Sequence, residues 1–385
     1  PHQMIVENRL RIFNAFLTEF PKDRPVTKYL PEYFKRNKQM GSRDRKNLSK
    51  AIYSYFRLGN CLAGLKSDER LFVALFLTSN SPDDMLAYFK PAYQELITAS
   101  LTEKAAYLTS VFPEFNLNDI FPFAAHLSTS IDQSLFISSQ LIQPDLFIRV
   151  IKGAEQKLAD YLNEAQIPFQ KKEFCYRLPN AAKLLNTEYL FEVQDQSSQY
   201  TANYFQPKPK QMWWDCCAAS GGKSLLLHAL EPSVYILASD NRASSLLNLE
   251  VRFKQAGITQ FRRREIDLLA EINSIEKDSM DGIILDEPCS GSGTWSRTPE
   301  MLSQFNESQI EKFIYLQRTI AENAVQFLKP GCPLVYITCS VFKEENEEAV
   351  AYFLANLPLK LEKMELIKGY ESKADTMFVA RFLKH

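Results

Sequence analysis

The chain has 385 residues, of which 45% are hydrophobic and 24% are charged, and its formal net charge is -1. This length predicts two or three domains, and the composition is that of an ordinary protein with a sizeable core. The near-neutral charge argues against a protein that coats nucleic acid indiscriminately, although it is compatible with a local basic face. The longest apolar run, residues 71–77, is far too short to span a membrane, and the first residues lack the cleavage site of a secretory signal. We therefore expect a monomeric cytoplasmic protein that does not enter membranes.

The cysteines do not follow the spacing of a metal site. Neither C-x-x-C nor H-E-x-x-H occurs in the sequence, and the number of cysteines is odd. We therefore expect no bound metal and no disulfide framework. The seven cysteines lie at positions 61, 175, 216, 217, 289, 332 and 339.

The first part of the chain, residues 1–143, predicts an all-α domain. Ser100 and Glu103 form the capping-box pattern that starts a helix. Two other stretches carry apolar side chains at intervals of three and four residues, as on the buried face of a helix. These side chains are Val6, Leu10, Phe13, Leu17 and Phe20, followed by Leu48, Ile52, Tyr55 and Leu58.

A basic stretch lies within this helical part. Residues 35–50 carry seven basic side chains and a single acidic one, Asp44. Such a stretch is either a patch that contacts RNA or the solvated start of a helix, and the sequence alone leaves both readings open.

The pattern changes near Pro144. Residues 144–205 predict a small α/β unit, with strands at 144–151 and 171–178 and a helix at 154–166 between them. From residue 206 to residue 385, short apolar strands alternate with helical patterns, which predicts a parallel sheet with helices on both faces. Ligands of such sheets bind beyond the carboxyl ends of the strands. The predicted strands lie at 212–218, 234–240, 261–267, 281–288 and 333–340.

The loop after the first of these strands, DCCAASGGKS, raises two interpretations. Gly222, Lys223 and Ser224 match the end of a phosphate-binding loop, but Cys217 stands where that loop needs its first glycine. A nucleoside-binding loop explains more of the sequence, because Asp240 ends the next strand and can hold ribose hydroxyls. Asp267 ends the third strand, where it would border an adenine. The candidate loop comprises Cys217, Ala218, Ala219, Ser220, Gly221, Gly222 and Lys223.

Two further strands end in cysteine loops, DEPCSGSGTW and TCSVF. A single cysteine is more often a small buried hydrophobic residue than a reactive one. Cys289 and Cys339, however, both lie at strand ends beside the nucleoside loop, which indicates thiolate chemistry. Asp286 precedes Cys289 by three residues and could contact the ring of a pyrimidine base. From the residues alone, either cysteine could be the nucleophile.

Four stretches together resemble the RNA (cytosine-5) methyltransferase family, in particular the bacterial Sun-like group that methylates small-subunit ribosomal RNA. They are VQDQSSQ at 193–199, CAASGGKS at 217–224, DEPCSGSGTW at 286–295 and LKPGCPLVYITCSVFKEENE at 328–347. Residues 41–58 look like the NusB-like helical domain of the same group.

This resemblance implies a Rossmann-like domain that binds S-adenosyl-L-methionine, with contacts from the loop at 217–223 and from Asp240, Asp267 and Asp286. It also implies that Cys339 is the nucleophile and that Cys289 helps to expel the product. The implied substrate is RNA, with ribosomal RNA favoured, whose target cytosine is unstacked and becomes 5-methylcytosine.

Two residues depart from the family pattern. Ser220 stands where the family usually has proline, and Glu287 where it usually has a small residue. A carboxylate close to Cys289 would disfavour its thiolate.

Two other functions stay open: a catalytically inert RNA-binding protein and, less favoured, a nucleotidase with a phosphate loop.

Overall fold

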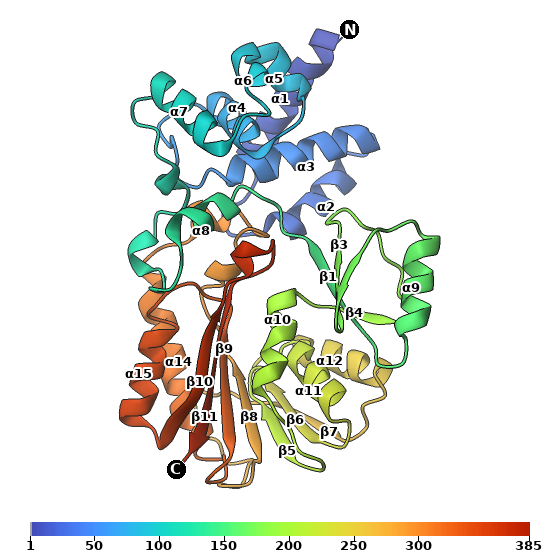
Figure 1. The fold of residues 1–385 in the computed structure, drawn as a ribbon, viewed down its shortest axis with the longest axis vertical. Helices are drawn as coiled ribbons and strands as arrows, with labels where there is room; N and C mark the ends of the chain where they lie inside the picture. The colour runs from blue at the N-terminus through green and yellow to red at the C-terminus, as the bar shows by residue number, and fades with distance from the viewer. Residues whose placement is uncertain (1) are drawn as a thin grey trace. The chain divides into compact units, whose positions relative to one another are not determined.

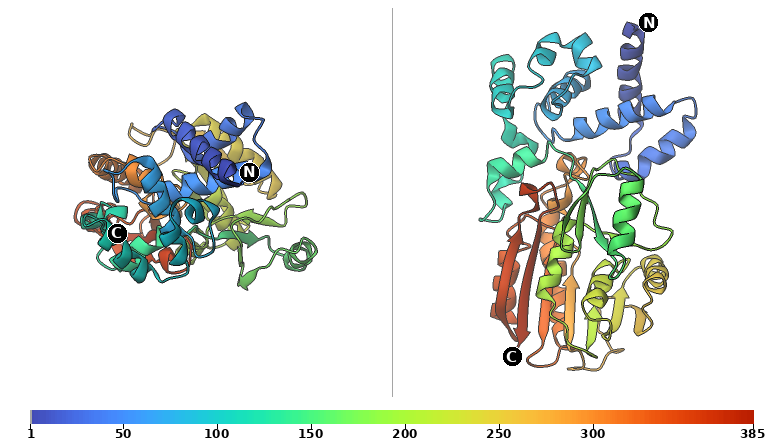
Figure 2. Two further views of the ribbon diagram at one scale, coloured as in Figure 1. Left: turned by 90° about the horizontal axis from the view of Figure 1, so that it is seen from above. Right: turned by 45° about the vertical axis from the view of Figure 1, so that its right-hand side comes forward.

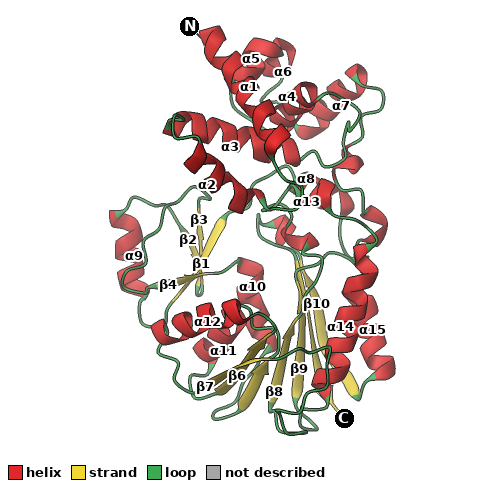
Figure 3. Ribbon diagram, turned by 180° about the vertical axis from the view of Figure 1, so that it is seen from behind, coloured by secondary structure: helices red, strands yellow, loops and turns green. Residues whose placement is uncertain are grey.

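The computed structural model describes residues 2–385 and divides the chain into two compact units (Figure 1). The helical unit comprises the residues up to Ala125 together with Asp132–Gln143 and Trp295–Glu307. The sheet unit comprises His126–Ile131, Pro144–Thr294 and Ser308–His385. All the strands that the structure describes belong to the sheet unit (Figure 3).

The helical unit is built around α4 (Ser67–Thr78), whose apolar run from Leu71 to Leu77 is buried throughout. The longest apolar run of the sequence is therefore a core helix, and in the described part of the chain no helix has the length and apolar composition to cross a bilayer. The other helices of this unit are α1 (His2–Glu19), α2 (Val26–Arg36), α3 (Ser42–Phe56), α5 (Asp84–Phe89), α6 (Pro91–Glu95), α7 (Leu101–Val111), α8 (Gln133–Ser139) and α13 (Met301–Gln304).

The predicted capping box at the start of α7 is confirmed. The Glu103 amide donates to the Ser100 hydroxyl at 3.2 Å, and the Ser100 amide donates to the Glu103 carboxylate at 3.0 Å. Two amide groups that would lack partners at a helix start are satisfied in this way.

The first part of the sheet unit is a small antiparallel sheet in the order β2-β3-β1-β4, covered on one face by α9 (Figures 1 and 2). The prediction of a single strand at 171–178 is wrong, because the chain turns within it. Glu173 has a φ of 54°, and Lys172 pairs with Cys175 across the turn. The elements are β1 (Leu146–Val150), α9 (Glu155–Glu164), β2 (Gln170–Lys172), β3 (Cys175–Leu178) and β4 (Phe191–Val193).

The second part is a seven-stranded sheet in the order β10-β11-β9-β8-β5-β6-β7. The five predicted strands are confirmed and run parallel, whereas β11 pairs with β9 in the antiparallel sense, so the sheet is mixed rather than purely parallel. The strands are β5 (Met212–Asp215), β6 (Tyr235–Asp240), β7 (Phe261–Glu265), β8 (Gly282–Asp286), β9 (Pro333–Thr338), β10 (Leu359–Ile367) and β11 (Met377–Lys384).

Helices cover both faces of this sheet. On one face, the apolar side chains of α14 (Gln309–Val325) and α15 (Glu347–Asn356) form a core with β5, β8 and β9. On the other face, α11 (Gly222–Leu230) and α12 (Ala243–Gln255) pack on β5 and β6, and α10 (Gln196–Tyr200) lies near them (Figure 1). This is the Rossmann-like arrangement, in which the loops after the strands gather at one edge.

The two units exchange segments along the chain. Residues 295–307, which follow the Cys289 loop, belong to the helical unit: the buried Arg57 guanidinium donates to the Ser296 carbonyl at 2.9 Å, and Glu300 accepts from the Val26 amide at 3.1 Å. In the other direction, His126–Ile131 belong to the sheet unit. The division into domains at 1–143, 144–205 and 206–385 stays a prediction.

Candidate active site

A pocket of about 340 Å³ opens at the carboxyl ends of the strands in the sheet unit. Predicted site residues that line it are Ala218, Ala219, Ser220, Gly222, Lys223, Asp286 and Cys339. The small sheet and α10 contribute Arg149, Glu192 and Ser198, and residues near β11 contribute Asp375 and Met377. The predicted loop, the predicted acid and one of the two cysteines therefore share one cavity.

The start of α11 forms one wall of this pocket. Gly221, at the N-cap of the helix, has a φ of 94°, and a side chain there would meet Leu249 and Phe253 of α12. A glycine is therefore required for the loop to enter the helix at this angle. The positive end of α11 faces the cavity through Gly222 and Lys223, which favours an anionic or polar ligand.

Asp240, at the end of β6, is hydrogen-bonded to the candidate cofactor loop at 217–223. Its carboxylate, 6% exposed, accepts from the Ala219 amide at 3.0 Å and from the Arg242 amide and guanidinium at 3.0 and 3.1 Å. Asp267 lies elsewhere: its side chain is exposed, accepts from the Leu269 amide, and does not line the pocket. Cys217 also points away, toward the core beneath α14 and α15.

Lys223 is an internal cation of the site rather than a surface lysine. It is 8% exposed, and its Nζ donates to Asp286 Oδ2 at 3.0 Å and to the Ser198 hydroxyl at 2.8 Å. The ion pair fixes the Asp286 carboxylate at the end of β8, within the pocket wall. Charge-assisted hydrogen bonds of this kind are shorter and stronger than neutral ones.

The two cysteines meet although they follow different strands. Cys289 Sγ lies 3.4 Å from Cys339 Sγ, and both thiols are free. The hydrogen bond with Cys339 and burial together raise the pKa of Cys289 well above its ordinary value. The raised pKa favours the protonated form of Cys289, and of the two cysteines Cys339 is the one that lines the pocket.

A buried carboxylate links the two cysteine loops. Glu345 Oε1 accepts from the Ser290 amide at 2.8 Å and from Gln317 Nε2 at 3.1 Å, and its Oε2 accepts from the hydroxyls of Ser290 and Ser340. Ser290 follows Cys289 directly, and Ser340 follows Cys339. The carboxylate is fully enclosed, so its four donors satisfy a charge that could not otherwise be buried.

Gly293 adds a backbone link between the same loops. Its amide donates to the Cys339 carbonyl at 2.8 Å, and its carbonyl accepts from the Thr376 amide at 2.9 Å. A Cβ at this position would lie 1.8 Å from the Thr376 carbonyl oxygen. The second glycine of the Cys289 loop therefore lets three chain segments pass within hydrogen-bonding distance.

Ser220, one of the two departures, binds a neighbouring helix. Arg252 of α12 donates to the Ser220 hydroxyl at 2.8 Å and to its carbonyl at 3.0 Å, and it also pairs with Glu192 of β4 at 2.8 Å. The hydroxyl that replaces the usual proline thus ties the candidate cofactor loop to the small sheet.

Glu287, the other departure, faces away from the pocket. Burial is the main cause that raises the pKa values of Cys216, Cys217 and Tyr336 on the α14 and α15 face of the sheet, and proximity to the Glu287 carboxyl contributes to all three. The pKa of Cys289 is raised mainly by the hydrogen bond with Cys339 and by burial, and the carboxylate that adds to this shift is Glu345 rather than Glu287. Because successive residues of a strand point to opposite faces, Asp286 enters the pocket and Glu287 does not.

Sequence reasoning missed several residues of the site. Ser198 lies in the VQDQSSQ stretch that supported the resemblance, so a signal for it was present. Arg149 and Arg252 carry no motif, and Glu345 is one of several acids in a charged run. Arg149 is 6% exposed and donates to Gln194 Oε1 at 3.2 Å at the pocket wall.

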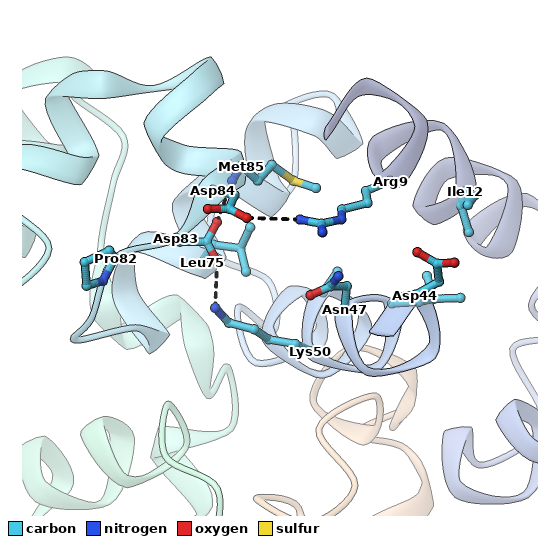
Figure 4. Close-up of a pocket in the computed structure, with 12 residues that line it drawn as sticks. Arg9, Ile12, Asp44, Asn47, Lys50, Leu75, Pro82, Asp83, Asp84 and Met85 are labelled. Atoms are coloured by element: carbon cyan, nitrogen blue, oxygen red, sulfur yellow. Dashed lines mark hydrogen bonds and ion pairs between the residues drawn. The ribbon is translucent and has the colours of Figure 1, made fainter. Parts of the chain in front are cut away.

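A second pocket, of about 190 Å³, lies in the helical unit between α1, α3 and α5 (Figure 4). Four of its five charged groups pair with one another: Lys50 with Asp83 at 2.6 Å, and Arg9 with Asp84 at 3.4 Å. None of the predicted site residues lines this pocket.

Residues 202–385 match the family described as 16S rRNA methyltransferase RsmB/F. Ribosomal RNA small subunit methyltransferase B of Shewanella oneidensis is 35% identical over 167 residues, which cover 42% of this chain and 38% of that protein. The tRNA (cytosine(72)-C(5))-methyltransferase NSUN6 of Mus musculus is 34% identical over 212 residues, or 52% of this chain and 44% of that protein. These matches therefore span less than half of each relative's own length.

Among solved structures, the crystal structure of PH0851 superposes with a TM-score of 0.71 at 20% sequence identity. The superposition covers 92% of this chain and 93% of that one, so the likeness extends over both units and concerns the fold. Together with the sheet order, these findings identify a helical N-terminal part followed by a Rossmann-like methyltransferase fold.

Glu287 predicts a dependence of stability on pH. Both of its carboxylate oxygens are buried without a hydrogen-bond partner, and burial, followed by the charge of Asp286, raises its pKa well above 4.5. The folded state therefore binds this proton more tightly than the unfolded state does. The stability that this proton contributes is fully present at a pH below the ordinary pKa of a glutamate, and it is lost as the pH rises towards the raised pKa of the folded state. We expect Glu287→Gln to stabilise the chain by about 1 to 3 kcal/mol more at about pH 8 than at about pH 5 in urea unfolding.

Glu271→Gln is the matched control, because Glu271 is exposed and the same charge is removed. An equal gain at both pH values would show that the Glu287 carboxyl is not an unpaired buried acid.

Proposed function

We propose that the chain is an S-adenosyl-L-methionine-dependent RNA methyltransferase that forms 5-methylcytosine, because residues 202–385 match the family described as 16S rRNA methyltransferase RsmB/F. One observation carries the proposal: Cys339, 3.4 Å from a second thiol, lines the same pocket as the paired Lys223 and Asp286. The substrate we propose is ribosomal RNA, with the target cytosine unstacked so that it can enter the pocket.

The residues around the loop fit the proposed cofactor. Ala218, Ala219 and Ser220 line the cavity beside the positive end of α11, where backbone amides favour a polar ligand. The buried Asp240 carboxylate at the end of β6 is not among the residues that line the cavity, but it accepts from the Ala219 amide and so holds this loop in place. S-adenosyl-L-methionine, when bound, supplies an electrophilic methyl group.

The chemistry needs a nucleophile because carbon 5 of cytosine is not reactive enough by itself. In the proposed reaction the Cys339 thiolate bonds to carbon 6, which makes carbon 5 electron-rich enough to take the methyl group. A base then removes the proton from carbon 5, and the bond between sulfur and carbon 6 breaks, which regenerates the thiolate. Cys339 supports this role because it lines the pocket.

Cys289 supports the complementary role. Its raised pKa keeps the thiol protonated beside Cys339, so it can donate a hydrogen bond to the sulfur when the product leaves. Asp286, fixed by Lys223, supports a role in holding the ring nitrogen or the exocyclic amine of the base during both steps.

The basic stretch at residues 35–50 supports RNA binding, but fewer of its basic side chains are available than its sequence suggested, because three of them bind other groups of the protein. Arg36 pairs with Glu19, Lys50 pairs with Asp83, and Arg45 donates to the Met40 carbonyl. The exposed side chains that remain available to phosphate groups are those of Lys35, Lys38, Arg43 and Lys46.

A catalytically inert RNA-binding protein and a nucleotidase remain the competing proposals. The first predicts RNA binding without methyl transfer, and the second predicts ATP binding at the same loop. Measurements of cofactor binding and of the covalent adduct separate all three.

Cofactor binding should depend on Asp240. Asp240→Ala removes a buried charged acceptor and frees the Ala219 amide, so we expect roughly 10- to 100-fold weaker binding of S-adenosyl-L-methionine by calorimetry. Glu250→Ala, on the exposed face of α12, is the control and should bind normally. Tight ATP binding without binding of S-adenosyl-L-methionine would favour the nucleotidase.

The cysteines should separate attack from release. Cys339→Ala should abolish methyl transfer and leave no covalent RNA complex, because no sulfur bonds to carbon 6. In the Cys289→Ala variant, Cys339 should still attack carbon 6 and the base should still be methylated, but the RNA product should be released slowly. A denaturant-resistant protein–RNA band that depends on S-adenosyl-L-methionine should therefore accumulate in gels. Asp286→Ala should slow both steps.

Cys332→Ala is the control for cysteine loss. Cys332 is free and precedes β9, at the end of the strand opposite the pocket, so its removal should leave activity unchanged. An adduct in Cys339→Ala and none in Cys289→Ala would mean that the Cys289 loop carries the nucleophile.

The basic stretch should determine the salt dependence of RNA binding. Changing Lys38, Arg43 and Lys46 to Gln should reduce the slope of log affinity against log salt by about 2, since each phosphate contact contributes about 0.7. The same change at Lys208, Lys210 and Lys277 removes equal charge from exposed positions outside the helical unit and should leave the slope unaltered. Equal slopes in both triple variants would show that the basic stretch is a solvated surface that does not contact RNA.

A further inference from the structure

Six residues of the N-terminal part lie within the sheet unit. His126–Ile131 belong to that unit, although the residues up to Ala125 and those from Asp132 onward belong to the helical unit. We call these six residues the crossing segment. They are far from both cysteines in the sequence, and no motif marks them.

The crossing segment is bonded to the loop that follows Cys339. Leu127 forms an antiparallel bridge with Phe342. The Ser128 amide donates to the Val341 carbonyl at 2.8 Å, and the Lys343 amide donates to the His126 carbonyl at 2.7 Å. The segment therefore extends the backbone hydrogen bonding around the cysteine loop by a short paired stretch.

Ser128 also enters a buried side-chain network. It is 1% exposed, its hydroxyl donates to Glu347 Oε2 at 2.9 Å, and it accepts from Asn346 Nδ2 at 3.2 Å. The fully enclosed Asn346 amide donates to the Ser340 carbonyl at 2.9 Å and accepts from the Thr338 hydroxyl at 2.6 Å. One amide thus contacts the residue before Cys339 and the residue after it.

We propose that Ser128 is a positioning residue for Cys339: by holding the Asn346 amide, it fixes the two residues that flank the thiol. The proposal rests on the function proposed above. An amide whose donors and acceptor are all engaged has one orientation, and removal of the serine hydroxyl leaves an amide hydrogen buried without a partner. The amide then turns, and the cysteine loop moves with it.

A small displacement of the sulfur is enough to slow the reaction. Attack on carbon 6 requires a near-attack distance of roughly 3 to 3.5 Å, and a misplacement of about 1 Å can cost up to a hundredfold in rate. Binding of RNA does not involve the buried Ser128 hydroxyl. The residue should therefore act on the rate of adduct formation and not on affinity.

The test compares Ser128→Ala with the unchanged chain in single-turnover experiments. The probe is a 16S rRNA transcript that contains 5-fluorocytosine, in which the fluorine cannot leave carbon 5 and the adduct is trapped. We expect the rate constant of adduct formation to fall roughly tenfold, with the final amount of adduct and the RNA affinity within about twofold of the unchanged chain. Ser54→Ala, which removes a buried hydroxyl in the helical unit, should leave the rate constant unaltered.

A purely structural role gives a different result. If Ser128→Ala only reduces the folded fraction, the amount of adduct falls while its rate constant stays the same, and this outcome overturns the inference. An unchanged rate and amount overturn it as well. If the unchanged chain itself forms no adduct and transfers no methyl group, the proposed function fails, and the inference fails with it.

A second variant keeps the test valid if Ser128→Ala does not fold. Glu347→Gln leaves the buried hydroxyl in place and weakens only its partly exposed acceptor, so the chain should fold. A smaller drop in the same rate constant, roughly threefold, is expected, and no change in that rate would contradict the proposal.

Discussion

The carboxylate of Glu345 holds together two loops that the sequence separates. It accepts hydrogen bonds from residues directly after Cys289 and directly after Cys339, and the two sulfur atoms lie 3.4 Å apart beside it. A buried carboxylate is tolerated only when its oxygen atoms accept hydrogen bonds. The serines that follow the two cysteines are therefore needed to stabilise the Glu345 charge as well as to shape the loops. The hydrogen bond with Cys339 and burial are the main causes that raise the pKa of Cys289, and the nearby Glu345 charge adds to them.

The rest of the site compensates charge in a similar way. Lys223 would be costly to bury alone, but it neutralises Asp286 and receives a further acceptor from Ser198. Arg252 connects Ser220 of the cofactor loop with Glu192 of the small sheet. The pocket is therefore lined by groups whose positions are fixed before a ligand enters, which lowers the ordering cost of binding.

Much of this arrangement could be predicted from the sequence, and the remainder shows where such reasoning stops. Strands β5, β6, β8 and β9 were predictable because each is a short apolar run followed by a polar or acidic residue, whereas β7 is largely charged and was placed by the alternation of strands and helices. The strand-end rule then placed Asp286 and Cys339 together. The turn at Glu173 was missed because no glycine or asparagine marks it.

Residues that act through tertiary contacts were not predictable. Glu345 and Asn346 become part of the site only because the segment before α15 folds back onto β9, and Ser128 only because the crossing segment, distant along the chain, belongs to the sheet unit. The hydrogen bonds between Ser290 and Glu345 and between Asn346 and Ser128 join residues far apart along the chain, and no local pattern encodes such pairings.

The exchange of segments between the units also constrains the order in which the chain can fold during synthesis. The helical unit includes Trp295–Glu307, so its N-terminal helices emerge from the ribosome long before the segment that completes their core. Arg57 has no Ser296 carbonyl to bind until then. The helical unit can therefore be completed only after residues 295–307 have been synthesised, unlike a domain built from one continuous N-terminal stretch. The contacts between its N-terminal helices and residues 295–307 form only after most of the sheet unit has been synthesised.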